Sequence, residues 1–348
     1  MSRLALLLLF ALVAAPVMAQ STDEAPMADA AEMTESAEMT ESAEMADSAD
    51  MADEAAPADD PRTAYTAKLE EAQAAAEADT PEGYLQAASL YLEERDIAAE
   101  SGDEELVPFA ASATESAVAS YKSAGDAHKA MAEAAGEDEA AAAAAYMDAA
   151  EQFVLAADLT SGLDNASNEA TLRYFAGDAF ADGGDFENGM AQLNTAVELA
   201  PEEYNFQLVR AQVMMKSGDM AGAQSMLTEL IATTEAAGEA NVNGMAGQML
   251  GMTYLRAANA QIKDKDYSAG IATLDEAAPL LGEDNETLNK LYAGAYYRLG
   301  AAQVQSESFG PAQSNLEQAL AYARRAGMDR IVGAAQQQLD YIAEVSGN

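Results

Sequence analysis

The stretch GDAFADGGDFENGMAQLNTAVELAP, residues 177–201, contains the pattern that decides the fold. Small and large residues recur in it at spacings of three and four, as they do on the faces of helices, and Gly183-Gly184 interrupts the pattern. The stretch therefore indicates two helices joined by a tight turn. It contains no paired nucleophile and base, no cluster of metal ligands and no glycine loop of the phosphate-binding kind.

The same pattern recurs further along the chain. GGDFENGMAQLNTAVEL aligns with KSGDMAGAQSMLTELI, so that Phe186 and Met220 coincide after a step of 34 residues. KDKDYSAGIATLDEAA and SESFGPAQSNLEQAL continue the series, with Tyr267 and Phe309 in the same place after steps of 47 and 42. A pair of helices cannot bury its outer face alone, so repeated pairs are expected to stack into an array.

The aligned residues resemble the tetratricopeptide repeat (TPR) family. In that family small residues lie between two antiparallel helices, and a turn with Gly-Asp or Gly-Asn followed by an aromatic residue joins them. The residues that carry the resemblance are, in the four copies, Gly177, Ala179, Phe180, Gly184-Asp185-Phe186, Gly189, Leu193, Ala196 and Pro201; Ala211, Gly218-Asp219-Met220, Ala223 and Leu227; Ala258, Asp266-Tyr267, Gly270, Leu274 and Ala277; and Leu299-Gly300, Phe309, Ala312, Leu316 and Ala319.

The resemblance covers residues 168–325 and implies a right-handed superhelical array of antiparallel helical hairpins, a TPR-like α-solenoid. The chain departs from the family pattern where Gly189 and Gly270 replace the usual Ala, where Leu230 replaces a late Ala, and where the third and fourth turns lack Gly. Abundant Ala and glycine stops between apolar-periodic segments independently predict an all-α fold. With a capping helix over residues 329–345, the repeat domain is expected to occupy residues 168–348.

Residues 63–167 also read as long helices with apolar residues at spacings of three and four. The segment Ser123-Ala124-Gly125-Asp126 could form a turn of the repeat type, although no aromatic residue follows it as in the motif. We interpret residues 63–167 as two or three divergent helical hairpins continuous with the array. A separate helical bundle is the alternative.

The chain begins MSRLALLLLFALVAAPVMAQ, in which Arg3 precedes an apolar run and Pro16 precedes a small-residue ending at Ala19. This layout predicts a signal peptide over residues 1–19 that is removed after Ala19. An uncleaved anchor is the alternative, but the run is shorter than the roughly 20 residues that a spanning helix needs. We therefore expect an exported protein, periplasmic or extracellular, with no membrane insertion after cleavage.

Residues 20–62 include the run AEMTESAEMTESAEMADSADMADE, in which methionine recurs every six residues. A step of six distributes these methionines around a helix, so no single face could be buried. With no aromatic residue and no basic residue before Arg62, the segment lacks the apolar area that would offset the entropy of ordering it. It is expected to be a disordered acidic linker. The alternative is capture of a soft metal ion such as Cu(I) by the thioethers.

The chain has 60 acidic and 17 basic residues, which gives a net charge of -43. Such a chain repels nucleic acid and anionic membranes, so neither is expected as a partner. The same acidity would suit a protein kept in concentrated salt, where repulsion between its charges is screened. Cysteine is absent, so neither a disulfide nor a thiolate metal site can form.

The sequence offers no constellation for catalysis. His128 is the only histidine, and no G-x-S-x-G motif or equivalent accompanies it. The run DKDYSAGIATLDE departs from the order of a calcium-binding loop at Tyr267, and the repeat frame already accounts for it as a turn. We therefore expect a structural histidine, no catalytic residue, no metal site, no cofactor and no enzymatic activity.

In the TPR family, side chains of the first helices line a concave groove that holds a protein or peptide. The resemblance implies that the corresponding residues here are Tyr174, Asp178, Asp182, Leu208, Gln212, Lys216, Leu255, Asn259, Lys263, Tyr297 and Val304. The resulting hypothesis is an exported, non-catalytic scaffold whose groove binds an unidentified protein or peptide. The alternative is a protein that handles metal or other ions through its acidic, Met-rich N-terminal segment.

Overall fold

The computed structural model describes residues 60–347, and every regular element in this range is helical. Thirteen α-helices and one short 3-10 helix follow one another, with no strand between residues 60 and 347, so the predicted all-α fold is confirmed. The predicted signal peptide and the Met-containing acidic run lie outside the described residues. Across the described range, no helix combines the length and the apolar character that crossing a bilayer requires.

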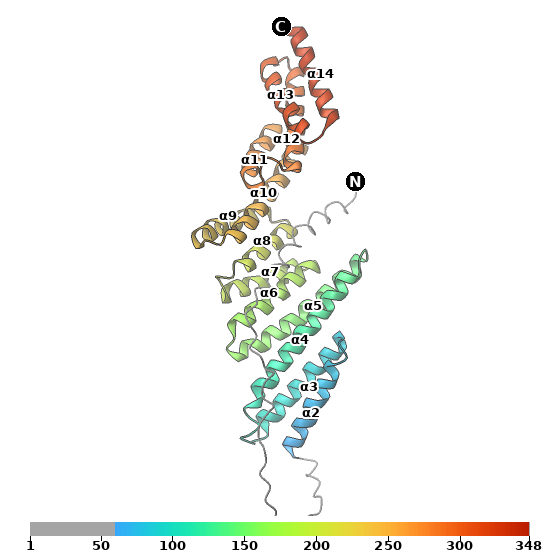
Figure 1. The fold of residues 1–348 in the computed structure, drawn as a ribbon, viewed down its shortest axis with the longest axis vertical. Helices are drawn as coiled ribbons and strands as arrows, with labels where there is room; N and C mark the ends of the chain where they lie inside the picture. The colour runs from blue at the N-terminus through green and yellow to red at the C-terminus, as the bar shows by residue number, and fades with distance from the viewer. Residues whose placement is uncertain (1–59, 348) are drawn as a thin grey trace, which may run out of the picture. The chain divides into compact units, whose positions relative to one another are not determined.

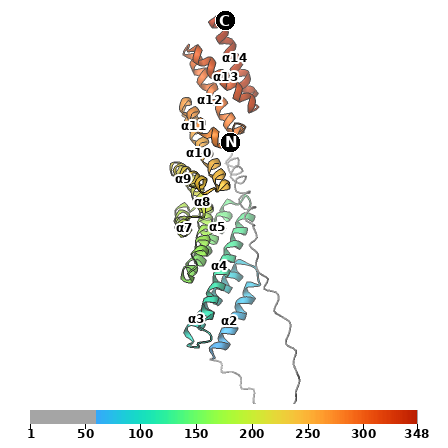
Figure 2. The same ribbon diagram turned by 60° about the vertical axis from the view of Figure 1, so that its left-hand side comes forward.

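The helices pack in the order in which they occur in the chain (Figure 1 and Figure 2). They are α2 (Pro61–Ala76), α3 (Pro81–Glu100), α4 (Phe109–Ala134), α5 (Glu139–Thr160), followed by the 3-10 helix Ser161–Leu163, α6 (Ala166–Asp182), α7 (Phe186–Leu199), α8 (Tyr204–Ser217), α9 (Met220–Ala237), α10 (Ala240–Lys263), α11 (Tyr267–Leu281), α12 (Glu286–Gln305), α13 (Phe309–Arg325) and α14 (Asp329–Ser346). Each helix contacts its neighbours in the chain, and α6, α8, α10, α12 and α14 also contact one another in succession. This nearest-neighbour packing is that of a TPR-like helical repeat array.

The second helix of each predicted repeat begins at the residue that the motif places after the turn. These first residues are Phe186 of α7, Met220 of α9, Tyr267 of α11 and Phe309 of α13. In three of the turns an aspartate caps the helix, because the carboxylates of Asp185, Asp219 and Asp266 accept backbone N–H hydrogen bonds at 3.1, 2.9 and 3.1 Å. Such caps contribute about 1 kcal/mol each to helix stability.

Inside each hairpin, a small residue of the first helix lies against a leucine that follows sixteen positions later in the second helix. The four pairs are Gly177 with Leu193, Ala211 with Leu227, Ala258 with Leu274, and Gly300 with Leu316. All four leucines are fully buried. A Cβ atom added at Gly177 would lie 2.6 Å from Cγ of Leu193 and 2.9 Å from the carbonyl oxygen of Gly189, so the two backbones approach closely only because side-chain atoms are absent there.

The turns that lack glycine use the same backbone conformation as those that contain it. At the position before the capping residue, φ is +91° at Gly184 and +94° at Gly218, and it is +68° at Lys265 and +59° at Glu307. A left-handed conformation costs a residue with a Cβ roughly 1–2 kcal/mol. The third and fourth turns therefore keep the geometry of the motif at the expense of some backbone strain.

The region before residue 168 forms helices α2 to α5, and α5 packs directly against α6. The turn considered for Ser123-Ala124-Gly125-Asp126 does not form, because these residues lie inside α4. Gly125 is a packing position instead: a Cβ atom there would lie 2.7 Å from the ring of Phe153, which fills the contact between α4 and α5. The division of the array at residue 167 stays a prediction.

The substitution Gly177→Ala should lower the free energy of unfolding by about 1–3 kcal/mol, because the added methyl group would overlap Leu193 and the backbone of α7. Chemical denaturation followed by circular dichroism measures the change. The matched control is Gly244→Ala in α10, where an added Cβ atom would meet nothing within 4 Å. There the higher helix propensity of alanine should raise stability by up to about 1 kcal/mol. Equal effects at the two positions would contradict the close approach.

The substitution Glu307→Gly should raise the free energy of unfolding by roughly 0.5–1 kcal/mol, because relief of the left-handed conformation outweighs the entropy that glycine adds to the unfolded chain. The reciprocal control, Gly218→Ala, should lower it. The same denaturation experiment measures both. Loss of stability in both variants would show that the fourth turn stores no strain.

Candidate partner-binding surface

The residues predicted to line a groove lie on the first helices of four successive hairpins. Helix α6 carries Tyr174, Asp178 and Asp182; α8 carries Leu208, Gln212 and Lys216; α10 carries Leu255, Asn259 and Lys263; and α12 carries Tyr297 and Val304. The structure separates these eleven residues into groups. The apolar residues pack between hairpins, three of the polar residues form a connected cluster, and the other polar residues lie apart from it.

The apolar members of the set hold neighbouring hairpins together. Leu208 and Leu255 belong to hydrophobic clusters and are only 6% and 9% exposed. Tyr297 and Val304 pack against the cluster formed by α13 and α14, and the ring of Tyr174 stacks on Phe206 with 4.8 Å between ring centroids. Leu208 and Leu255 present little surface to a partner, while Tyr174, Tyr297 and Val304 are half-buried against their neighbours.

The polar members on α6 form ion pairs with lysines of the two adjacent first helices. Nζ of Lys129 on α4 lies 3.4 Å from Oδ2 of Asp178, and Nζ of Lys216 on α8 lies 2.6 Å from Oδ1 of Asp182. The four side chains are between 21% and 26% exposed, so they are shielded and yet reachable from solvent. One row of charges thus connects three consecutive hairpins.

Tyr146 of α5 belongs to the same surroundings. Burial raises the pKa of its phenol to about 12, and Asp182, Glu133 and Asp178 add to the effect. We refer to Lys129, Tyr146, Asp178, Asp182 and Lys216 as the polar cluster. Because the carboxylates act on the phenol, the cluster is electrostatically one unit that spans α4, α5, α6 and α8.

The surroundings of Asp178 disfavour its ionised form. Burial raises the pKa of Asp178 first, and repulsion by Asp182 one helical turn away raises it further, while Lys129 and Lys216 act in the opposite direction. Burial raises the pKa of the adjacent Tyr174 phenol to about 12, and Asp178 contributes to that shift. Although the cluster pairs two carboxylates with two ammonium groups, burial and the charge of Asp182 together outweigh the two lysines at Asp178.

Three of the predicted polar residues lie outside the polar cluster. Gln212 and Asn259 are half-buried, and Lys263 is exposed in the last turn of α10. None of the ion pairs among residues 60–347 involves Lys263. The structure thus brings together Asp178, Asp182 and Lys216 from the predicted set.

Sequence reasoning missed Lys129 and Tyr146. Lys216 follows Asp182 by 34 residues, which is the repeat step, so the frame of the repeats places the two residues at equivalent positions on neighbouring helices. Lys129 and Tyr146 lie before residue 168. There α4 and α5 are longer than α6 and α7, and their sequences do not align with the repeat motif. No local motif signals that they reach α6.

His128 has no arrangement for catalysis. Its side chain is 14% exposed, and Nδ1 lies 4.0 Å from Oδ2 of Asp148 without a hydrogen-bond partner. No hydrogen-bonded nucleophile accompanies it, as a triad would require. In the part of the chain that the structure describes, no group of three or more His, Asp or Glu side chains is placed to hold a metal ion.

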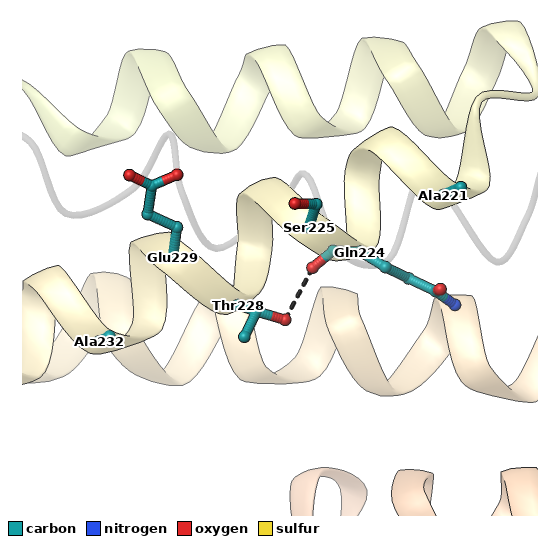
Figure 3. A pocket seen from close by; sticks show the side chains of 6 residues that line it. All are labelled: Ala221, Gln224, Ser225, Thr228, Glu229 and Ala232. Atoms are coloured by element: carbon teal, nitrogen blue, oxygen red, sulfur yellow. Dashed lines mark hydrogen bonds between the residues drawn. The ribbon is translucent and has the colours of Figure 1, made fainter.

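A shallow depression on α9 is the other surface feature of note. It is lined by Ala221, Gln224, Ser225, Thr228, Glu229 and Ala232, which all lie on one helix. Figure 3 shows Glu229 and Gln224 pointing away from each other, and Oγ1 of Thr228 donates a hydrogen bond to the backbone of its own helix at 2.8 Å. Binding sites need polar groups that converge on a ligand, and those of α9 do not.

Comparison with known proteins gives no functional assignment. No protein-family model matches the chain, and no curated protein matches it. Among solved structures, the TPR2AB domain of yeast Sti1 in its complex with pHSP90 is 12% identical, with 81% of this chain and 99% of that chain covered and a TM-score of 0.27. Yeast Tom70 is 13% identical over 83% and 66% of the two chains, with a TM-score of 0.26. The TPR domain of P58(IPK) is 14% identical over 80% and 94%, with a TM-score of 0.23. Similarities this distant carry no argument about function.

The substitution Asp178→Asn should make the protein more stable at neutral pH. The raised pKa of Asp178 means that the folded state binds its proton more tightly than the unfolded state does. The stability that the protonated carboxyl group contributes is therefore lost as the pH rises from the ordinary pKa of an aspartate through the raised one. An amide keeps an oxygen for Lys129 and carries no charge. Thermal unfolding should therefore show a higher Tm for the variant at pH 7, with a gap that closes toward pH 3.

The control for this experiment is Glu151→Gln, which removes the same charge from an exposed position on α5. It should leave the dependence of Tm on pH close to that of the wild type, apart from the small effect of net charge. A Tm for Asp178→Asn below that of the wild type at pH 7 would mean that the pair with Lys129 outweighs burial and repulsion by Asp182.

Proposed function

We propose that this chain is a non-catalytic scaffold that binds a protein or peptide on the surface formed by α4, α6 and α8. The observation that carries the proposal is the polar cluster, in which Lys129, Asp178, Asp182 and Lys216 come from three consecutive hairpins and remain about one-quarter exposed. A surface assembled from successive repeats suits an extended ligand, because each hairpin offers a contact at a regular distance from the last.

The charge of the surface favours a basic partner. Asp178 and Asp182 lie one turn apart on α6, and the charge of Asp182 disfavours ionisation of Asp178. A lysine or arginine side chain of the partner would favour the ionised form of Asp178, and Tyr146 would be available for contact with its aliphatic stem or its cation. The net charge of the whole chain would also accelerate encounter with a basic protein and discourage acidic ones.

The cellular setting belongs to the same proposal. The layout of residues 1–19 supports export and cleavage, after which the scaffold would act in the periplasm or outside the cell, without membrane insertion. N-terminal sequencing of the protein purified from its own source would test this, since cleavage after Ala19 leaves Gln20 as the first residue. A mature protein that retains residues 1–19 would contradict export with cleavage.

The partner can be identified by affinity purification from an extract of the natural source at native salt, with residues 20–348 as bait and mass spectrometry of the bound proteins. For the partner so identified, the double substitution Asp178→Asn with Asp182→Asn should weaken binding by at least tenfold, which corresponds to about 1.4 kcal/mol. Titration calorimetry measures the affinity. Thermal unfolding of the double variant under the binding conditions checks that it is folded, because Asp182→Asn also removes the carboxylate paired with Lys216.

The matched control is the double substitution Glu151→Gln with Glu198→Gln, which removes two charges from exposed positions outside the polar cluster. It should change the affinity less than threefold. Equal losses in the two double variants would mean that net charge alone attracts the partner and that α4, α6 and α8 are not its binding surface. A variant without residues 21–60 distinguishes the scaffold from the ion-handling alternative. The deletion would abolish ion binding by the Met-rich segment and leave partner binding intact.

A further inference from the structure

Glu94 is a buried acid without a full set of partners. It lies on α3, it is 2% exposed, and its Oε2 atom accepts no hydrogen bond. A buried carboxylate that keeps its charge needs hydrogen bonds or an ion pair to replace water, and a protonated carboxyl group needs far less. The site therefore favours the neutral acid.

The hydroxyl group of Tyr65 on α2 is the neighbouring hydrogen-bond donor to Glu94. The ring of Tyr65 also lies against Phe109, the first residue of α4, with 5.9 Å between ring centroids. Glu94 is thus placed at the contact of α3 with α2, where the charge of one side chain acts on the docking of a whole helix.

Helix α2 has few other attachments to the array. Ala72 is its one fully buried residue, and α2 packs mainly on α3. Besides the ring contact of Tyr65 with Phe109, α2 makes surface ion pairs, among them Arg62 with Asp103 at 2.6 Å and Lys68 with Glu93 at 2.9 Å. Exposed pairs of this kind contribute little to stability, because water and dissolved salt screen them. Docking of α2 is therefore sensitive to a single unfavourable charge beneath it.

The charged and titratable groups around Glu94 do not neutralise it. Tyr65 of α2 and Tyr91 of α3 are the groups on which its charge acts. Lys68 of α2 is engaged by acidic residues at the surface, and α4 meets this end of α2 with the uncharged ring of Phe109. Burial raises the pKa of Glu94, and the hydrogen bond from Tyr65 opposes the shift in part.

We propose that Glu94 is a proton-dependent latch, which holds α2 on α3 while it is neutral and loosens α2 when it ionises. The docked state binds the proton more tightly than the undocked state, so undocking is favoured as the pH rises. The opening equilibrium of α2 should increase by up to tenfold per pH unit between the ordinary pKa of an exposed glutamate and its raised value in the docked state, and should level off above that value. Loosening would uncover the face of α3 on which α2 packs.

Hydrogen exchange of the full chain tests the latch. After correction for the intrinsic dependence of exchange on pH, amides of α2 should lose protection as the pH rises from 4 to 7. Amides of α13, far from Glu94 in the array, should serve as the internal reference. Glu94→Gln should keep α2 protected across this range, because the amide cannot ionise. The matched control is Glu100→Gln, at an exposed position of the same helix, and it should behave like the wild type.

A second variant tests the latch independently of whether Glu94→Gln folds. The hydrogen bond from Tyr65 favours the ionised form of Glu94, so Tyr65→Phe should move the midpoint of the change in α2 protection to higher pH. A midpoint that stays in place or moves to lower pH would overturn the proposal. So would protection of α2 that does not change with pH in the wild type, or that changes equally in Glu94→Gln.

Discussion

The fold depends on one contact, in which a residue with little or no side chain on a first helix meets a fully buried leucine on the second. Gly177 with Leu193 and Gly300 with Leu316 show it most clearly, since a Cβ atom at either glycine would overlap the leucine. The contact fixes the distance between the two helices of a hairpin. That distance determines which residues are left at the outer faces of the hairpin, and therefore where the next hairpin can stack. In a chain without cysteine, packing of this kind must supply most of the stability.

Much of the repeat region could be predicted from sequence because its signals are local. The starts of α7, α9, α11 and α13 coincide with the aligned residues after each turn, and capping aspartates precede three of them. The absence of glycine from the third and fourth turns did not affect the prediction of the hairpins, because Lys265 and Glu307 adopt the same left-handed conformation. Before residue 168 the same reasoning failed at Gly125, since a glycine inside a helix that receives an aromatic ring looks in sequence like a glycine at a turn.

The candidate surface was less predictable than the fold, because it depends on contacts between hairpins. The sequence places Leu208 and Leu255 on the correct helices, but it gives no sign that the neighbouring hairpin buries them. It also gives no sign that Lys129 reaches across to Asp178. Such contacts depend on how far each hairpin is rotated and shifted relative to the next. That rotation and shift are set by the small residues of many helices together. Periodicity alone identifies the face of a helix and not the distance to its neighbour.

The sequential packing of the helices has a consequence for how perturbations travel. Each helix contacts mainly its neighbours in the chain, so the folded state resembles a linear series of units coupled pairwise. In such a series cooperativity is limited by the weakest junction, and partial melting spreads inward from an end and stops where the coupling is strongest. Helix α2 lies at one end and the polar cluster begins two helices further on. Whether undocking of α2 changes the stability of the polar cluster therefore depends on the two interfaces in between, α2 with α3 and α3 with α4.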